Sequence, residues 1–345
     1  MLNSSVVPAS QQPSRSPAWA GLRIGLGLAC LLALTGCAAL EVRMGSRIRL
    51  DKVPIASMQA RLPQGSAIAP GEKSPLVVVL AEPNGSAFMT EGKGHGKVLW
   101  KDLKVTATVA TVNKKGIVSL PEDPRISDGK LPHVTITAPS HPGIQAELDV
   151  PVRYDYNYTA KFYGSSGTDG ASGTDGTDGS GGMMGSIDPD NPAAGGDGSN
   201  GTNGSDGQDG GVGEDGPHVQ VRVGIRPGSY ALLQVDVSSE SYDKLFMIDP
   251  QGGSLTVSST GGAGGSGGKG GRGGHGGSGG IGIPNGRDGS NGSDGRSGSD
   301  GRAGSGGSIT VIYDPQAKPF LYTLRLLNQG GPAPAFIERP VGSLW

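Results

Sequence analysis

Glycine recurs at every third position in four separate stretches of this 345-residue chain. The stretches are residues 164–187, 195–218, 261–284 and 286–309, here called blocks one to four, and each holds eight glycines in the same phase. A flexible linker has no reason to keep a strict period, or to repeat one count four times. The pattern therefore predicts four regular, extended segments of equal length.

A three-residue period matches the polyproline II helix, which has three residues per turn and a rise of about 3.1 Å per residue. A 24-residue block would then extend about 74 Å. One face of each helix would carry only glycine, so backbones could approach closely along it. These blocks hold 43 of the 64 glycines, and the rest of the chain is ordinary in glycine content.

Two known kinds of structure use such a glycine face. The blocks resemble collagen-like repeats, but they contain only two prolines, Pro217 and Pro284, whereas collagen needs about 15–20%. Block three reads Gly-Gly-X from Gly261 to Gly280 and resembles the polyglycine II bundles of some antifreeze and phage-fibre domains. That resemblance implies helices that pack within one chain. A collagen-like trimer and a disordered tract remain the alternatives.

The breaks between the blocks indicate chain reversals. A nine-residue segment with two prolines, 186–194, joins blocks one and two, and Pro284-Asn285 joins blocks three and four. We therefore expect two antiparallel hairpins, over 164–218 and 261–307. The first hairpin is acidic, whereas block three carries Lys269, Arg272 and His275, so opposite charges could bring the hairpins together.

The N-terminus has the features of an export signal. Arg15 and Arg23 precede an apolar stretch, Ile24 to Leu34, which is too short to span a bilayer. The stretch ends in Leu34-Thr35-Gly36-Cys37, which resembles the lipobox of bacterial lipoproteins. The resemblance implies cleavage between Gly36 and Cys37 and acylation, with palmitate among the chains, at Cys37. It also implies anchorage in the outer membrane, because Ala38 rather than Asp follows the cysteine.

The segments around the blocks alternate between apolar and polar residues, which is the pattern of β-strands. Residues 154–162 place three tyrosines, Ala160 and Phe162 on one face, and 219–225 alternate likewise. We expect an all-β fold of Ig-like β-sandwich units with inserted Gly-X-Y hairpins and no significant α-helix after the signal. The expected division is a signal (1–36), a linker (37–44), a β-sandwich (45–163), hairpin one (164–218), a second β unit (219–260 and 308–330), hairpin two (261–307) and a Pro-rich tail (331–345).

The sequence contains few motifs that indicate catalysis or metal binding. Asp169, Asp175 and Asp178 are candidate calcium ligands, but the blocks lack the aliphatic residues that fill a calcium-binding β-roll. Gly-X-Ser-X-Gly around Ser266 lies inside a glycine tract, where no strand-to-helix turn is expected. We expect no catalytic residues, no cofactor and no metal. The tyrosines Tyr154, Tyr156 and Tyr158 either form the packed face of a sheet or stack on sugars.

The composition also limits the functional classes. A net charge of −2 excludes a strongly basic nucleic-acid binder, and 34% hydrophobic residues exclude one compact globule of this length. We expect a non-enzymatic, lipid-anchored envelope protein with a structural, adhesive or spacer role. Its expected partners are the membrane, through Cys37, and other envelope proteins or polysaccharide. The open alternatives are a glycan- or ligand-binding lipoprotein, a collagen-like trimeric stalk and an ice- or surface-binding protein.

Overall fold

The computed structural model describes residues 47–228, 231–240 and 242–345. The fold is all-β, and the one α-helix among these residues is the single turn α2 (Pro124–Ser127). The 3-10 turns are η1 (Leu50–Lys52), η2 (Gly92–Gly94), η3 (Trp100–Asp102) and η4 (Pro315–Thr323). None of the helices in this part of the chain is long and apolar enough to cross a bilayer. The chain divides into two compact units.

Unit one comprises described residues 47–68, 72–120 and 129–151. Its strands are β1 (Ser57–Arg61), β2 (Lys73–Pro75), β3 (Val77–Ala81), β4 (Ala87–Met89), β5 (Lys104–Thr108), β6 (Thr111–Val112), β7 (Ile117–Ser119), β8 (His133–Thr137) and β9 (Gln145–Asp149). They form three antiparallel sheets with the orders β1-β3-β4, β2-β7-β6 and β5-β8-β9. Val78, Leu80, Val134 and Ile136 are fully buried, so the alternation of β8 directs one face into a sandwich-like core.

Unit two comprises residues 69–71, 121–128 and 152–345. Its strands are β10 (Asn157–Tyr163), β11 (Val219–Arg226), β12 (Leu232–Ser239), β13 (Tyr242–Ile248), β14 (Ser254–Thr260), β15 (Ile309–Tyr313), β16 (Leu324–Leu327) and β17 (Ala335–Glu338). One sheet has the order β10-β14-β16 and is parallel throughout. The other has the order β13-β12-β11-β15-β17, with β11, β15 and β17 parallel.

The two sheets of unit two share one core. Tyr158 and Phe162 of β10, with Leu255 of β14, belong to the same buried cluster as Val221 of β11 and Val235 of β12. Tyr158 also packs on Phe246, with ring centroids 5.4 Å apart. Alternate residues of β10 are buried, as the sequence alternation predicts, so this face of the strand is a packed sheet face.

The division of the chain differs from the expected one, in which residues 69–71, 121–128 and 152–163 were all placed in the first β-sandwich. Unit one ends at Pro151 rather than at residue 163, because β10 pairs with β14 of unit two. The Pro-rich tail 331–345 contains β17, which adds to the edge of the sheet beside β15. Its end is also held by Gln234, whose side-chain oxygen accepts a hydrogen bond from the Leu344 amide at 3.1 Å.

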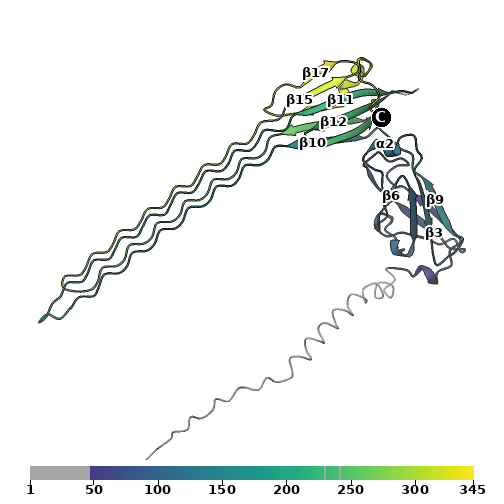
Figure 1. Cartoon of the computed structure of the whole chain (residues 1–345). Coiled ribbons are helices and arrows are strands. Elements are labelled where there is room, and N and C mark those ends of the chain that lie inside the picture. The colour runs from purple at the N-terminus through teal and green to yellow at the C-terminus, as the bar shows by residue number, and fades with distance from the viewer. Residues whose placement is uncertain (1–46, 229–230, 241) are drawn as a thin grey trace, which may run out of the picture. The chain divides into compact units, whose positions relative to one another are not determined.

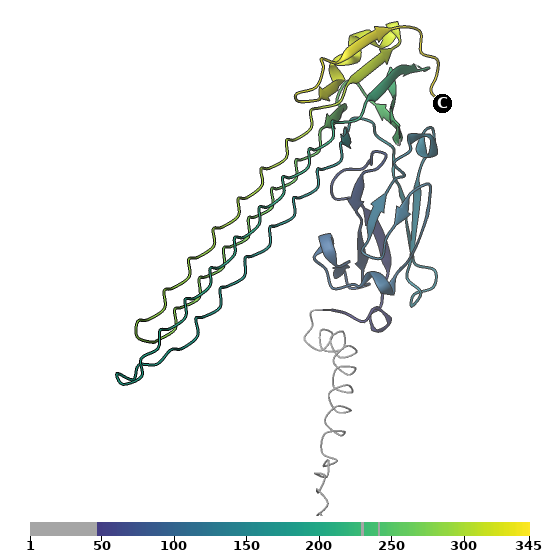
Figure 2. The ribbon, with the colours of Figure 1, turned by 60° about the vertical axis from the view of Figure 1, so that its left-hand side comes forward.

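Each glycine block continues directly from, or into, a strand of unit two. Blocks one and three follow β10 and β14, which pair in parallel, and blocks two and four lead into β11 and β15, which also pair in parallel. Figures 1 and 2 show the four blocks leaving the sheets side by side. Each hairpin, made of blocks one and two or of blocks three and four, therefore runs from one sheet to the other. The pairing of the strands at its base determines which blocks are neighbours and how their residues are aligned.

Candidate functional site

Backbone hydrogen bonds with a three-residue period join the blocks along their length. Blocks one and three run parallel: every third amide from Gly167 to Gly185 donates to a block-three carbonyl, as from Gly173 to Lys269 at 2.7 Å. Blocks one and two run antiparallel, as Gly211 donates to Thr168 at 2.7 Å and Glu214 to Ser165 at 2.9 Å. Blocks two and four are parallel, whereas blocks three and four are antiparallel.

Block three bonds to each of the other blocks, as block two also does. The Gly271 amide donates to Ser205 of block two, and the Gly271 carbonyl accepts from Gly295 of block four. The next residue, Arg272, accepts at its carbonyl from Gly176 of block one. One triplet thus bonds to all three other blocks. The second glycine of each triplet from Gly262 to Gly280 is buried, which explains why this block alone is Gly-Gly-X.

The buried glycines are required by close backbone approach. A Cβ on Gly271 would lie 2.0 Å from the carbonyl oxygen of Thr174 and 2.4 Å from its carbonyl carbon. Real Cβ atoms do not come within 3.0 Å of such neighbours. The same clash recurs at Gly268 and Gly274, against Ala171 and Thr177. Any side chain at these positions would therefore separate the blocks.

Some backbone amides of the blocks do not donate to a backbone carbonyl. Side-chain oxygens from neighbouring blocks accept hydrogen bonds from these amides. Asp175 accepts from the Arg272 amide at 2.7 Å, and Asp206 accepts from the Arg296 amide at 2.6 Å. The Thr202 hydroxyl likewise accepts from the Thr177 amide at 2.7 Å. Further acceptors of this kind are Asp169, Asp178, Asp197, Ser199, Asn200, Asn203, Ser205, Asp209, Asp215, Asp288, Asn291, Asp294 and Asp300. The polar residues of the blocks therefore extend the hydrogen-bond network.

The three candidate calcium ligands are part of this network. Asp169, Asp175 and Asp178 accept from the amides of Ser266, Arg272 and His275, each at 2.7 Å. The described residues contain no cluster of three or more His, Cys, Asp or Glu side chains able to hold a metal ion. This structural role was not predicted, although Asp and Asn recur visibly at the third position of the triplets.

We expect Asp175→Ala to weaken the bundle locally, because the Arg272 amide loses its charged acceptor. The cost should be about 1 kcal/mol, since this amide is close to water that can partly replace the carboxylate. Amide hydrogen exchange at Arg272 should accelerate accordingly. Asp175→Asn keeps a side-chain oxygen and should exchange at nearly the parent rate; equal protection in the Ala and Asn variants would show that the contact contributes nothing.

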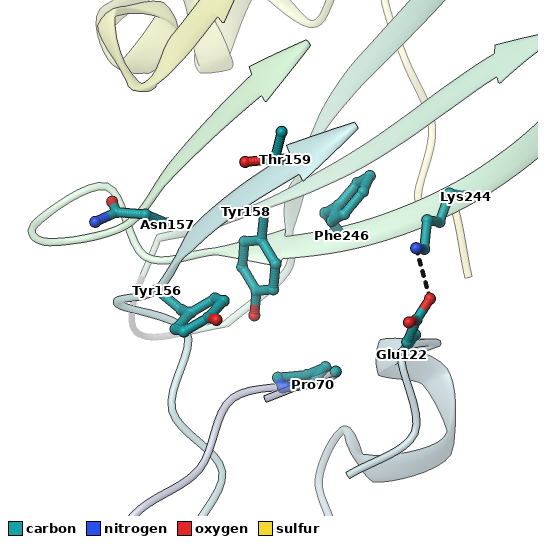
Figure 3. Close-up of a pocket in the computed structure, with 9 residues that line it drawn as sticks. Pro70, Glu122, Tyr156, Asn157, Tyr158, Thr159, Lys244 and Phe246 are labelled. Carbon is teal, nitrogen blue, oxygen red and sulfur yellow. Dashed lines mark ion pairs between the residues drawn. The ribbon is translucent and has the colours of Figure 1, made fainter. Parts of the chain in front are cut away.

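Two of the three alternating tyrosines, Tyr154, Tyr156 and Tyr158 (here called the tyrosine stripe), border a small pocket in unit two. Tyr156, Tyr158 and Phe246 line it beside the ion pair of Lys244 and Glu122, which are 2.5 Å apart (Figure 3). The Glu122 carboxylate raises the pKa of Lys244. The pocket volume is about 230 Å³, which is below the range of about 300–1,000 Å³ typical of small-molecule sites. Tyr158 is buried, so Tyr156 offers the larger accessible ring surface.

Tyr154, the remaining member of the stripe, belongs to a separate contact. Its hydroxyl donates to Asp128 at 3.3 Å, and Arg226 pairs with the same carboxylate at 2.9 Å. Burial, together with that carboxylate, raises the pKa of Tyr154 to about 12. These contacts of Tyr154 order the segment after α2. Because Tyr154 lies in this separate contact, the three tyrosines do not form one surface on which a sugar could stack.

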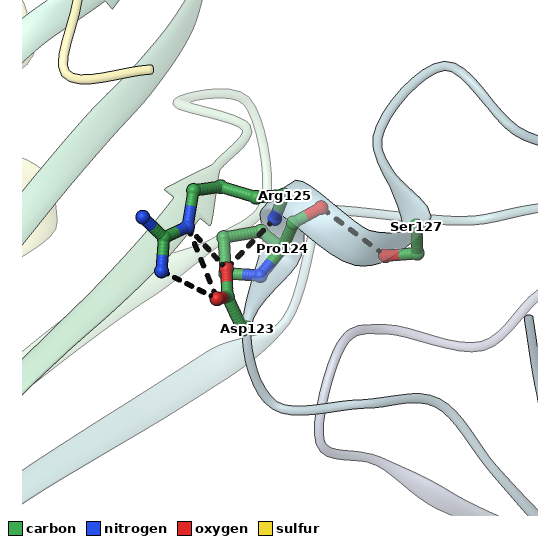
Figure 4. A network of polar contacts seen from close by, with 4 residues as sticks. All are labelled: Asp123, Pro124, Arg125 and Ser127. Carbon is green, nitrogen blue, oxygen red and sulfur yellow. Dashed lines mark hydrogen bonds and ion pairs between the residues drawn. The ribbon is translucent and has the colours of Figure 1, made fainter.

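A capped turn precedes these contacts. The Asp123 carboxylate accepts from the Arg125 amide at 3.0 Å and caps α2, whose first residue is Pro124 (Figure 4). The Arg125 guanidinium binds the same carboxylate at 2.7 Å and lowers the pKa of Asp123. The Ser127 hydroxyl donates to the Pro124 carbonyl at 3.4 Å. These hydrogen bonds all join residues of the same turn, so the network stabilises the turn itself.

The predicted lipidation site, Cys37, and the cleavage site after Gly36 lie outside the described residues. No protein-family model matches the chain, and no curated protein matches it in sequence.

Proposed function

We propose that this chain is a lipid-anchored, non-enzymatic protein of the bacterial outer membrane. Its glycine blocks form a polyglycine II-type rod that serves as a structural or adhesive spacer. The anchor would be a diacylglyceryl group and an acyl chain at Cys37, which together supply more than the single chain that gives only reversible membrane binding. Envelope proteins or polysaccharide are the proposed partners.

The continuity of the bundle is the observation that carries this proposal. Hydrogen bonds recur from Gly164 at the base to Gly185 at the far end, and each step bonds a triplet to its neighbours. A rod built in this way cannot bend at one point without breaking bonds to several blocks. At about 3.1 Å per residue, it would extend about 74 Å. Such a length, with polar side chains outside, suits a spacer.

The packing favours this arrangement over the alternatives. In a collagen-like trimer, the glycine face of each block would meet other chains, whereas here blocks of the same chain occupy it. A glycan-binding role would depend on the pocket at Tyr156, which is smaller than typical ligand sites. Neither alternative explains the matched length of the four blocks.

Shortening all four blocks together tests the spacer role. Deleting residues 170–175, 204–209, 267–272 and 295–300 removes two triplets at the same height from each block and preserves every remaining register. The rod should become shorter by about 19 Å. For the lipidated protein on a supported bilayer, reflectivity should report a protein layer that is thinner by up to that amount.

The matched control removes residues 170–175 alone. This deletion breaks the register between block one and its neighbours, so we expect loss of amide protection in the blocks rather than a shorter, ordered layer. If the four-block deletion leaves the layer thickness unchanged, the rod does not set the reach of the protein, and the spacer role is wrong.

A further inference from the structure

The far end of the glycine bundle is apolar, unlike the rest of its surface. Met183, Met184, Ile187, Ile281 and Ile283, here called the distal tip, are 87%, 76%, 67%, 54% and 47% exposed. In the blocks and turns outside this tip, Val212 is the one large apolar side chain that is strongly exposed among the described residues. The chain reverses at this end of the bundle (Figures 1 and 2), and apart from Val212 the strongly exposed apolar side chains of the blocks lie here.

Backbone contacts hold the distal tip together as one surface. The Gly185 amide donates to the Ile281 carbonyl at 2.8 Å, which joins the ends of blocks one and three. The Ile283 amide donates to Ala193 at 2.9 Å, and Ala193 pairs with Ser186 in both directions. Residues from the ends of blocks one and three therefore present their side chains from a single ordered end.

The fold does not use these side chains for its own packing. Hydrogen bonds and glycine contacts set the register of the blocks, while Met183, Met184 and Ile187 remain largely in water and the two isoleucines of block three are half exposed. Exposed apolar patches that stand out from a polar surface mark interaction sites. The charged residues around this tip are four aspartates, Asp188, Asp190, Asp197 and Asp288, and one arginine, Arg287.

The small apolar area of the distal tip and the acidic residues around it indicate what kind of partner binds there. Five side chains offer only a few hundred Å², whereas a stable protein interface needs about 800 Å² on each partner. A tip-to-tip contact with a second copy is therefore too small to be stable. A bilayer surface requires no complementary shape, and apolar side chains can enter the boundary between headgroups and acyl chains. The acidic surroundings disfavour an anionic membrane.

We propose that the distal tip inserts into the surface of a zwitterionic phospholipid bilayer. This contact is separate from the anchor at Cys37 and does not depend on it. A chain with both features would contact membrane through its lipid and, independently, through the end of its rod.

The test uses residues 38–345 made without the signal segment, which contain every residue that the structure describes. Flotation with phosphatidylcholine vesicles should recover the protein in the lipid fraction. The variant Met183→Ser/Met184→Ser/Ile187→Ser should reduce the partition coefficient at least tenfold. Val212→Ser, which removes an equally exposed apolar side chain away from the tip, should bind as the parent does. Amide exchange should show that both variants keep the bundle.

Vesicles that contain phosphatidylglycerol should bind the parent protein more weakly than phosphatidylcholine vesicles do. Equal flotation of the parent and the triple variant, or no flotation of either, would overturn the proposal. A concentration-dependent dimer that the triple variant abolishes would assign the tip to a second copy instead. Because this chain lacks the lipid, failure here leaves the anchor and the spacer role untouched.

Discussion

Gly271→Ala is expected to destabilise the glycine bundle by about 1–3 kcal/mol, although the change adds only one methyl group. The added Cβ would lie 2.0 Å from the Thr174 carbonyl oxygen, so blocks one and three must separate. Separation lengthens the bonds that the Gly173 and Gly176 amides donate to the Lys269 and Arg272 carbonyls. The entropy that alanine removes from the unfolded chain, worth up to about 1 kcal/mol, does not offset this clash.

Lys269→Ala is the matched control, because it also ends in alanine, two residues away in the same block. The Lys269 side chain is exposed, and the bond that its carbonyl accepts from Gly173 does not involve that side chain. The change should alter stability by less than about 0.5 kcal/mol. Amide exchange of block residues measures both effects without assuming that the whole chain unfolds at once. Equal protection in the two variants would show that the blocks are not closely packed.

Cys37→Ser should abolish stable membrane anchorage, because serine offers no thiol for the diacylglyceryl group. The residues that motivate this are Leu34-Thr35-Gly36-Cys37, preceded by the apolar stretch. The protein should appear either as an uncleaved precursor or in the soluble fraction, and labelling with radioactive palmitate should be lost. Cys30→Ser is the control, since cleavage at the proposed site would remove that cysteine. A Cys37→Ser protein that is still cleaved and labelled would contradict the lipid assignment.

The strands of the fold were predictable because burial of one sheet face imposes a two-residue alternation. Residues 219–225 and 157–163 both show it, and they form β11 and β10. The partners of these strands were not predictable. β10 pairs with β14, almost a hundred residues later, and no local pattern encodes so distant a neighbour. The prediction placed β10 with unit one for this reason.

The period of the blocks was visible because each turn of such a helix brings the same position back to a neighbouring backbone. The second glycine of each block-three triplet, which packs against block one, was visible as the Gly-Gly-X pattern. The role of Asp175 and its equivalents was missed, because a carboxylate that binds an amide of another block looks the same in sequence as one that faces water. The apolar tip was likewise not singled out, since its residues come from two distant segments.

The rigid intrachain rod can be tested by one distance. Cysteines introduced at Ser166 and Met184, in a chain that begins at residue 38 and has no other cysteine, carry a pair of spin labels. Double electron–electron resonance on a verified monomer should give a narrow distribution of label-to-label distances near 56 Å, because 18 residues rise about 3.1 Å each. A broad distribution near 24 Å, the span of a flexible chain of that length at about 5–6 Å times the square root of the residue number, would contradict the rod.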